Sequence, residues 1–504
     1  MDVALRTQSG HNPSMDLSGI DLGRPDSQPL YLRLAAAIVS AVERGELSAG
    51  ERLPSERELA LRLGVSRTTV VGAYRELESR GLARGQVGRG TFVSVGAKTK
   101  STPFAWRGKV SLRSQRALDP TLRTLMGDTR PDVISFAVGI PALDEFPTGA
   151  YRRLTERVLR RGAEHTLGLV PTEGHPELRE VIATRCEVRA EEILVTNGAQ
   201  QALDLVSRCL LDPADTVIVD RPGFLGALAT FRAADANVVG WDFERADLGE
   251  LEDLILRYKP KFLYTNPSFQ NPTGRTLSPA TRNGLLRLAS RYRLPIVEDD
   301  ANCELYFHKA PPDSLYRLDR DGLVVYVGSF SKTLGAGLRL GWLSAPEDIV
   351  DQLALIKARS DLFTAGPVQM VVADMLASGL YDSHLDALRA EHWRRHEAMA
   401  RALRRYIPTN TLAWRPAEGG LYLWCRLGAG GDARELLRRS SGDAVTFVHG
   451  EPFYSDGTGK HHLRLCFSST APETIEEGVR RLAGLIGMER AEAGGSNLGT
   501  HPLT

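Results

Sequence analysis

The distribution of apolar residues changes period many times between residues 131 and 488. Short apolar runs, among them EEILVTN, DTVIVD, KFLYTN, LPIVED and GLVVYVGSF, alternate with stretches of helical periodicity. Strands that alternate with helices are typical of βαβ units, in which successive strands run parallel. The sequence therefore predicts an α/β body with a mainly parallel sheet.

A different pattern fills residues 28–95, where two short helical stripes precede a glycine-rich segment. In PSERELALRLGVSRTTVVGAYRELESRGL, Ser55 and Glu58 form a capping box, and Gly64 suits the left-handed residue that ends a helix. Ser66 caps a second helix, and the following LARGQVGRGTFVS predicts a β-hairpin. We expect this segment to be a winged helix-turn-helix.

The exposed first turn of the second helix carries Arg67, Thr68 and Thr69. In a helix-turn-helix this turn enters the major groove of DNA, where arginine bonds guanine and threonine contacts phosphate or the thymine methyl group. Gly88 and Arg89 lie at the tip of the hairpin, within reach of a groove or the DNA backbone. A small helical domain with a merely charged surface is the alternative interpretation.

The segments outside these two regions are mostly polar. A basic stretch with little periodicity separates them, and both ends of the chain are rich in small and polar residues. We predict a disordered N-terminus at 1–27, the winged helix-turn-helix at 28–95, a linker at 96–130, the α/β body at 131–488 and a disordered tail at 489–504.

The distribution of charge indicates a class of binding partner, and the cysteines and the lack of targeting patterns indicate a cellular location. The 504-residue chain has a net charge of +1, but residues 28–98 hold eleven Lys/Arg and seven Asp/Glu, which indicates a phosphate-binding face. The five cysteines are scattered without a CxxC pair, which argues against a disulfide framework or a metal site. Neither a signal-peptide pattern nor an apolar run of about 20 residues is present, so we expect a cytoplasmic protein without membrane contact.

One lysine stands out in the stretch GSFSKTLGAGLRLGW. Lys332 follows the strand-like run GLVVYVGSF and is surrounded by hydroxyl residues and glycines. A lysine removed from water loses its proton and becomes a nucleophile for a carbonyl group. Such a lysine holds pyridoxal 5′-phosphate (PLP) when an acid, a phosphate cradle and a partner for the ring hydroxyl accompany it.

Candidates for these companions follow one another along the chain at strand ends. Asp299 ends the run LPIVED and suits the pyridine nitrogen, and Asn271 in NPTG suits the ring hydroxyl. A helix start at Gly198, Ala199 and Gln200 offers free backbone N–H groups to a phosphate. Further candidates are Ser329 and Arg339 for the phosphate, and Arg464 for a substrate carboxylate.

Residues 28–94 resemble the winged helix-turn-helix of the GntR family through the motifs PSER at 54–57, GVSRTTV at 64–70 and GT at 90–91. The resemblance implies DNA contacts by residues that match family positions, and it extends the set inferred from the helix turn and the hairpin tip. The complete set of predicted DNA-binding residues is Arg57, Ser66, Arg67, Thr68, Thr69, Gly88 and Arg89.

Residues 131 to about 488 are similar to the fold-type I PLP-dependent aminotransferases, on the motifs just described. The resemblance implies that Lys332 forms a Schiff base with PLP and that Asp299 pairs with the ring nitrogen. It also implies that Phe224 stacks on the ring and that Arg464 binds a carboxylate. A GntR-type head with such a body resembles the MocR/GabR family of transcription regulators over nearly the whole chain.

Three positions depart from the family pattern. Ala301 stands where a tyrosine usually bonds the ring hydroxyl, and Leu169 stands where a tyrosine usually reaches the phosphate of a neighbouring subunit. Phe224 replaces a tyrosine and keeps the ring face. Two hydroxyl donors are lost, so we expect PLP binding to persist and transamination to be weak or absent.

The resemblance implies a transcription regulator that binds a double-stranded DNA operator as a head-to-tail homodimer. Its effector is PLP or a small amino compound, sensed through the Schiff base at Lys332. Two alternatives stay open. One is an active aminotransferase with an appended DNA-binding head, and the other is a regulator whose body no longer binds PLP.

Overall fold

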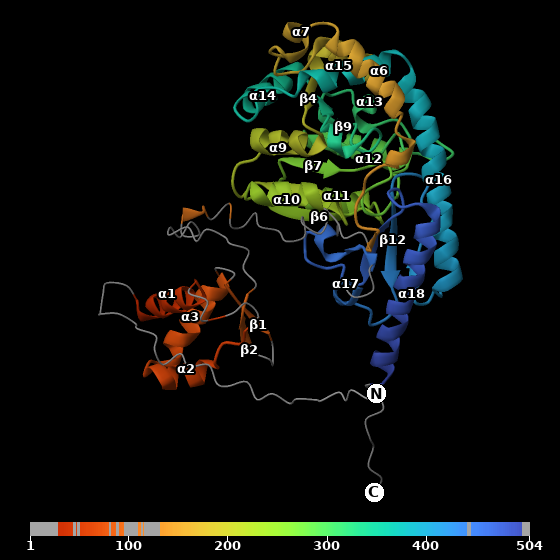
Figure 1. Cartoon of the computed structure of the whole chain (residues 1–504). Coiled ribbons are helices and arrows are strands. Elements are labelled where there is room, and N and C mark those ends of the chain that lie inside the picture. Colours follow the sequence, from red (N-terminus) through yellow and green to blue (C-terminus); the bar gives the residue numbers. More distant parts are fainter. Residues whose placement is uncertain are drawn as a thin grey trace, which may run out of the picture. The chain divides into compact units, whose positions relative to one another are not determined.

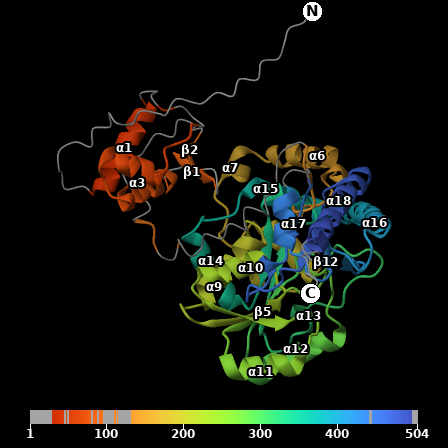
Figure 2. The ribbon, with the colours of Figure 1, turned by 90° about the horizontal axis from the view of Figure 1, so that it is seen from below.

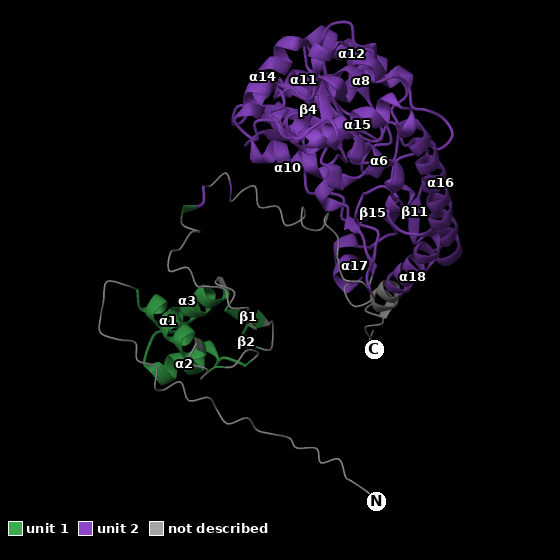
Figure 3. Cartoon of the chain, turned by 45° about the horizontal axis from the view of Figure 1, so that its top comes forward, with its two compact units in different colours: residues 1–109 green, residues 110–504 purple. Residues whose placement is uncertain are grey.

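The computed structural model describes residues 29–43, 47, 51–79, 82–86, 90–94, 109–111, 114, 132–440 and 445–495. The chain divides into two compact units, residues 1–109 and 110–504 (Figure 3). We call the first unit the head and the second the body.

The described residues of the head form three helices and a two-stranded hairpin. Ser55 Oγ accepts a hydrogen bond from the Glu58 N–H at 3.2 Å, and Gly64 ends the helix with a φ of 64°. Ser66 Oγ accepts from the Thr69 N–H at 3.1 Å, so each predicted cap is in place. The elements are α1 (Leu30–Glu43), α2 (Glu56–Leu63), α3 (Arg67–Ser79), β1 (Ala83–Gln86) and β2 (Gly90–Val93).

A shared apolar core holds the head together. Leu34 and Ile38 of α1, Leu59 of α2, and Val70 and Leu77 of α3 are almost fully buried in one cluster. These positions recur at helical spacing, which is why each short helix presents one apolar face. The antiparallel pair β1–β2 forms the wing beside them.

A seven-stranded sheet organises the body, in the order β4-β10-β9-β8-β7-β5-β6. β10 runs antiparallel to both of its neighbours, and the other pairs are parallel. The mainly parallel α/β fold is confirmed. The strands are β4 (Ile193–Thr196), β5 (Thr216–Arg221), β6 (Asn237–Asp242), β7 (Phe262–Thr265), β8 (Ile296–Asp299), β9 (Val324–Ser329) and β10 (Gly341–Ser344).

Helices cover both faces of this sheet (Figures 1 and 2). One face packs against α9 (Ala199–Leu210), α10 (Leu225–Ala233) and α14 (Glu347–Ala358). The opposite face packs against two groups of helices. They are α6 (Thr148–Leu159), α8 (Pro176–Cys186) and α15 (Gly366–Ala377), and then α11 (Leu248–Tyr258), α12 (Pro279–Tyr292) and α13 (Leu315–Leu318).

The C-terminal part of the body forms a smaller sheet with its own apolar core. The order is β11-β12-β15-β14, with all pairs antiparallel, and β3 pairs with β13. The strands are β3 (Ile134–Ser135), β11 (Leu412–Trp414), β12 (Tyr422–Leu427), β13 (Val445–Thr446), β14 (Val448–His449) and β15 (His462–Cys466). The short helices are α7 (Ala163–Leu167), α17 (Ala433–Ser440), η2 (Leu143–Glu145), η3 (Ala190–Glu192), η4 (Ala336–Leu338) and η5 (Glu451–Phe453).

Helix α16 (Leu380–Tyr406) joins the two sheets. Near its start, the Tyr381 hydroxyl lies 3.0 Å from Thr333 Oγ1, and His384 Nε2 donates to the Thr333 carbonyl at 2.7 Å. Its later turns lie beside α18 (Pro472–Gly495), as Figures 1 and 2 show. One continuous helix therefore connects the turn that carries Lys332 to the smaller sheet.

The C-terminal end differs from the sequence expectation. Helix α18 continues to Gly495, so residues 489–495 are helical where we predicted a disordered tail from residue 489. The segment RAEAGG contains two alanines and one glutamate, which favour continuation of a helix that has already begun. In the described part of the chain, no helix is long and apolar enough to cross a membrane.

Candidate cofactor pocket and DNA-binding face

Lys332 lies in the turn that follows β9. Its Nζ donates a hydrogen bond to the Gly139 carbonyl at 2.6 Å. Removal from water, followed by the positive charge of Arg464, lowers the pKa of Lys332 to about 8, although Asp299 acts in the opposite direction. An ordinary lysine has a pKa near 10.4, so this amine is uncharged far more often at neutral pH. The lowered pKa suits the nucleophilic role predicted for Lys332, which stays a prediction.

Asp299 is the last residue of β8 and is buried. Its Oδ2 accepts a hydrogen bond from the Tyr264 hydroxyl at 2.8 Å. Burial raises the pKa of Asp299 to about 6, while the bonds from Tyr264 and from the Ala301 backbone N–H lower it. At neutral pH the group is a carboxylate with acceptor capacity, which suits a protonated ring nitrogen.

Arg464, on β15, is buried against Asn271. Its Nη1 donates to Asn271 Oδ1 at 2.9 Å, and its Nη2 donates to the Ala137 carbonyl at 2.6 Å. The guanidinium lies 4.2 Å above the centre of the Tyr422 ring. Its Nε has no hydrogen-bond partner within the described residues, so a donor remains for an incoming acceptor. The structure thus brings two predicted site residues, 193 positions apart, into direct contact.

The predicted phosphate cradle forms where Arg339 meets the start of α9. Arg339 has a φ of 50°, and its Nη2 donates to the Asn197 carbonyl at 2.7 Å. Gly198 has a φ of 83°, and a Cβ there would lie 3.0 Å from Arg339 Nη2, so the position requires glycine. Ser329 ends β9 and accepts from the Ser331 N–H at 3.1 Å. Together with Ala199 at the first turn of α9, these groups suit an anion.

Gln200 and Phe224 lie at the edge of this cradle. The Gln200 side chain turns towards α10, where its Nε2 donates to Thr230 Oγ1 at 2.7 Å. Only its backbone N–H, in the first turn of α9, is thus left for the predicted contact with a phosphate, which stays a prediction. Phe224 precedes α10 and is half-buried, and a Cβ on Gly226 would lie 2.5 Å from its ring. The glycine gives the Phe224 ring the space that it occupies.

A buried polar network behind Asp299 was missed by the sequence analysis. Asp220 Oδ2 accepts from the Asn266 N–H at 2.7 Å, and Asn266 Nδ2 donates to the Asp299 carbonyl. Asn266 Oδ1 in turn accepts from the Asn271 N–H at 2.7 Å. Burial raises the pKa of Asp220 to about 7. Tyr264 and Asn266 therefore hold Asp299 and Asn271 in fixed positions.

The turn after β8 differs from the sequence expectation in one detail. Ala301 offers no hydroxyl, as predicted, but Asn302 beside it directs Nδ2 to the Phe269 carbonyl at 3.2 Å. Asn302 is buried, and its Oδ1 has no partner in the described part of the chain. Asn302 therefore presents an amide next to the segment that ends in Asn271. Leu169 is 90% exposed and supplies apolar surface.

Two of the predicted DNA-binding residues, Arg57 and Arg67, come together in the head. Arg57 and Arg67 line a hollow of about 260 Å³ with Gly90 and Thr91 of the wing. Arg67 Nη2 donates to Glu56 Oε2 at 3.0 Å, an ion pair between α2 and α3 that the sequence analysis missed. The arginine side chain nevertheless stays 72% exposed.

Three hydroxyl residues lie beside Arg67 in the sequence. The Ser66 hydroxyl lies 3.2 Å from Thr68 Oγ1 and 2.8 Å from Thr69 Oγ1, which fixes the first turn of α3. Ser66 and Thr68 are exposed and Thr69 is half-buried. Gly88 and Arg89 lie outside the described residues, so their predicted role stays a prediction.

The residues of the body fit PLP as a bound group. An amine of lowered pKa lies near a buried carboxylate, and a glycine-dependent anion cradle adjoins them. When bound, PLP supplies an electrophilic carbonyl and an electron-withdrawing ring. Lys332, Asp299, Asn271, Ser329 and Arg339 are the residues that would hold it.

Comparison with protein families gives a match for each of the two units. Residues 131–482 match the aminotransferase class I and II family, and residues 30–93 match the gntR family of bacterial regulatory proteins. The chain therefore belongs to the aminotransferase class I and II family, whose members depend on PLP, and carries a GntR-type helix-turn-helix.

Relatives of nearly full length narrow this assignment. The probable rhizopine catabolism regulatory protein MocR of Rhizobium meliloti is 30% identical, with 94% of this chain and 98% of the relative covered. The uncharacterized HTH-type transcriptional regulator YisV of Bacillus subtilis is 31% identical over 93% of this chain and 98% of its own length. The protein is a member of the MocR family of GntR-type transcription regulators.

The body alone is also similar to enzymes. The 2-aminoadipate transaminase of Thermus thermophilus is 38% identical over 75% of this chain and 97% of its own length. The crystal structure of LysN, an alpha-aminoadipate aminotransferase of Thermus thermophilus in complex with N-(5′-phosphopyridoxyl)-L-leucine, matches with a TM-score of 0.74. It is 36% identical and covers 77% of this chain and all of that one.

Proposed function

We propose that this protein regulates transcription by sensing PLP, or an amino compound that reacts with PLP, through Lys332. The observation that carries the proposal is that one chain joins a candidate DNA-binding face to a candidate cofactor pocket. The head presents Arg57 and Arg67 beside the wing, and the body assembles Lys332, Asp299 and Asn271. A protein that works on chromosomal DNA acts in the cytoplasm, which is the location we propose.

The head supplies recognition of double-stranded DNA. Arg67 is exposed and pairs with Glu56, so it is oriented before DNA arrives. Such an arginine reads guanine by two hydrogen bonds in the major groove. We propose a head-to-tail homodimer, whose two heads would read two half-sites in the operator.

The body supplies the sensor. Lys332 would attach PLP, Asp299 would hold its ring nitrogen, and Arg464 would orient a carboxylate on the effector. An effector regulates only if it binds two conformations of the body with different affinities. The direct bond between Arg464 and Asn271 links the carboxylate position to the ring position, so occupation of one alters the other.

The test combines spectroscopy and DNA binding. PLP added to the purified protein should produce a near-ultraviolet to visible absorption band that borohydride traps. Lys332→Ala should abolish the band, and Lys309→Ala, which changes an exposed lysine, should retain it. Genomic fragments selected by the wild-type protein should then show binding that depends on PLP or on an added amine. A lysine-independent band, or DNA binding indifferent to PLP and to amines, would contradict the proposal.

An active aminotransferase with a DNA-binding head is the second candidate, because the body is 38% identical to a transaminase. Amino-group transfer from an amino acid to a 2-oxo acid decides between the two. We expect weak or absent turnover, since Ala301 and Leu169 leave two hydroxyl donors missing. Robust turnover would establish the enzyme.

A further inference from the structure

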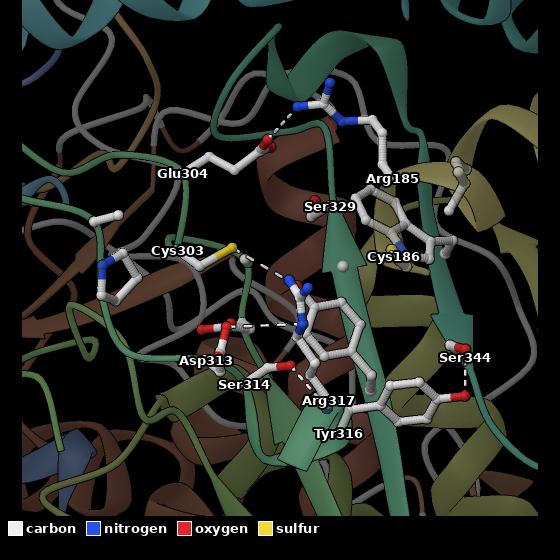
Figure 4. Close-up of a pocket in the computed structure, with 18 of the residues that line it drawn as sticks. Arg185, Cys186, Cys303, Glu304, Asp313, Ser314, Tyr316, Arg317, Ser329 and Ser344 are labelled. Carbon is white, nitrogen blue, oxygen red and sulfur yellow. Dashed lines mark hydrogen bonds and ion pairs between the residues drawn. The ribbon is translucent and has the colours of Figure 1, made fainter. Parts of the chain in front are cut away.

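The body contains a second cavity, of about 490 Å³, that the cofactor does not explain (Figure 4). It lies between α8, α13 and the strands β9 and β10. Side chains alternate between the two faces of a strand. Asp299 ends β8 on the same face as Val297, so the next residue, Asp300, points to the opposite face. Asp299 belongs to the cofactor pocket, whereas Asp300 and Ala301 line the second cavity. A single turn therefore separates the two spaces.

Aromatic rings form the walls of this cavity. Trp342 packs against Phe330 with 4.7 Å between the ring centres, and Tyr316 and Tyr326 lie on the neighbouring wall. The indole of Trp342 lies over Gly328, where a Cβ would come within 2.3 Å of it. This strand glycine is what makes room for the ring. The cavity has the size and the lining of a small-molecule site.

Two buried polar atoms in the lining lack hydrogen-bond partners among the described residues. They are Trp342 Nε1, a donor, and Asp300 Oδ1, an acceptor. Both side chains are more than nine-tenths buried. The Cys186 thiol lies beside the indole, but sulfur is a weak acceptor. Buried polar atoms are normally paired, so this unpaired donor and acceptor indicate a ligand that carries the complementary groups.

Asp300 is the buried carboxyl group of the lining, and the thiols and the phenol beside it are neutral. Burial raises the pKa of Cys186 to about 11, and burial likewise raises the pKa of Cys303 and of Tyr326 well above their usual ranges. Other charged residues of the lining are paired and partly exposed: Arg185 lies 2.9 Å from Glu304, and Arg317 lies 3.8 Å from Asp313. Figure 4 marks both ion pairs with dashed lines. An interior of this kind favours a molecule without net charge.

We propose that this cavity binds a neutral, planar aromatic molecule that accepts a hydrogen bond from Trp342 and donates one to Asp300. A fused-ring lactam is the simplest chemistry of this class. The ligand would lie against the turn of residues 300–304 and against Ser329, which also belongs to the phosphate cradle. A ligand bound there would contact residues beside the cofactor pocket without entering that pocket.

The experiment uses the PLP-loaded protein, so that the cofactor pocket is filled, and 2-quinolinone as the probe. This lactam has one N–H and one carbonyl. Calorimetric titration should show saturable binding, and 1-methyl-2-quinolinone, which lacks the N–H, should bind on the order of three- to tenfold more weakly. Trp342→Phe keeps an aromatic ring, removes the donor and should weaken 2-quinolinone binding by a similar factor.

Two control variants locate the probe. Trp424→Phe also removes a buried, unpaired indole N–H, but Trp424 does not line this cavity, so binding should not change. Trp393 lines another cavity of the body, and Trp393→Phe should likewise have no effect. No saturable binding, equal binding by Trp342→Phe, or a loss with Trp393→Phe alone would overturn the proposal.

A second measurement needs no variant. Cys186 and Cys303 line the cavity, whereas the half-buried Cys209 does not. 2-Quinolinone should therefore slow alkylation of Cys186 and Cys303 by N-ethylmaleimide, followed by mass spectrometry, and leave Cys209 unaffected. Equal protection of all three, or of none, would place the probe elsewhere.

Discussion

Arg67 of the head and Arg464 of the body are both candidates for holding an anion, but their surroundings differ. Arg67 is 72% exposed and pairs with a carboxylate, Glu56, that is itself 37% exposed. Arg464 is buried, pairs with a neutral amide and a carbonyl, and lies over the Tyr422 ring. An exposed ion pair is worth little and exchanges readily, whereas a buried guanidinium depends on each of its partners.

The difference separates two kinds of recognition. The head can exchange Glu56 for a base or a phosphate at small cost, and salt screens that exchange. The body holds Arg464 without a counter-charge in direct contact among the described residues, so a carboxylate would gain more there. We therefore expect salt-sensitive, gradual effects from changes in the head and large, specific effects from changes in the body.

The largest effect should follow from Arg464→Lys. Lysine cannot reproduce the planar fork, so affinity for L-leucine, measured by spectral titration of the PLP-loaded protein, should fall on the order of a hundredfold. Leucinamide, which lacks the carboxylate, should be affected little. Arg426→Lys, an exposed change on β12, is the matched control. An equal loss for both ligands would make Arg464 structural.

Arg67→Ala should come next. Removal of one bidentate base contact costs roughly 1–3 kcal/mol, which corresponds to about a 5- to 150-fold loss of operator affinity. The loss should be greater for the operator than for random DNA in a fluorescence-anisotropy titration. Arg75→Ala, exposed on the same helix, should weaken both DNAs by a similar, smaller factor. Equal behaviour of the two variants would remove Arg67 from base readout.

The pH dependence of PLP capture should be of intermediate size. Because the pKa of Lys332 is about 8, its uncharged fraction rises roughly tenfold from pH 6 to 7 and levels off above pH 8. The rate of borohydride-trappable attachment should follow that curve. Arg464→Gln removes a charge that lowers the pKa of Lys332, so the curve should move to higher pH. A rate that still rises through pH 10 would indicate an ordinary lysine.

Glu56→Gln should have the smallest effect on operator affinity. It tests most directly the contrast between the exposed pair of Arg67 and the buried contacts of Arg464. The glutamate orients Arg67 but also competes with DNA for it. Loss of its charge should change operator affinity only two- to threefold, the range expected for an exposed pair. The salt dependence of binding should change little, because Arg67 itself remains. A tenfold or greater change in affinity would mean that the ion pair is a strong positioning element.

Part of this architecture could be predicted from the sequence, because it depends on residues that are close together along the chain. The caps at Ser55, Gly64 and Ser66 follow from the positions of hydroxyl and glycine residues. Asp299 and Lys332 converge because Asp299 ends β8 and Lys332 follows β9, and the carboxyl ends of parallel strands share one edge of the sheet.

Other features depend on contacts across the fold, which no spacing rule reveals. Tyr264 reads as a core residue of β7, yet its hydroxyl bonds Asp299. Asp220 and Asn266 likewise sit within or beside apolar runs and have no sequence signal of their own. The pairing of Glu56 with Arg67 crosses two helices, and the cavity at Trp342 requires knowledge of how α8 and α13 pack.

Helix α16 gives the body a mechanical property. Its 27 residues make a rod about 40 Å long. One end is hydrogen-bonded to Thr333, the residue after Lys332, and the later turns lie along α18. A tilt of about 5° at the lysine end would displace the far end by roughly 3.5 Å, because the displacement of a rigid helix grows in proportion to its length. A small rotation of α16 beside the Lys332 turn would therefore produce a larger displacement at the far end of the helix, next to the smaller sheet.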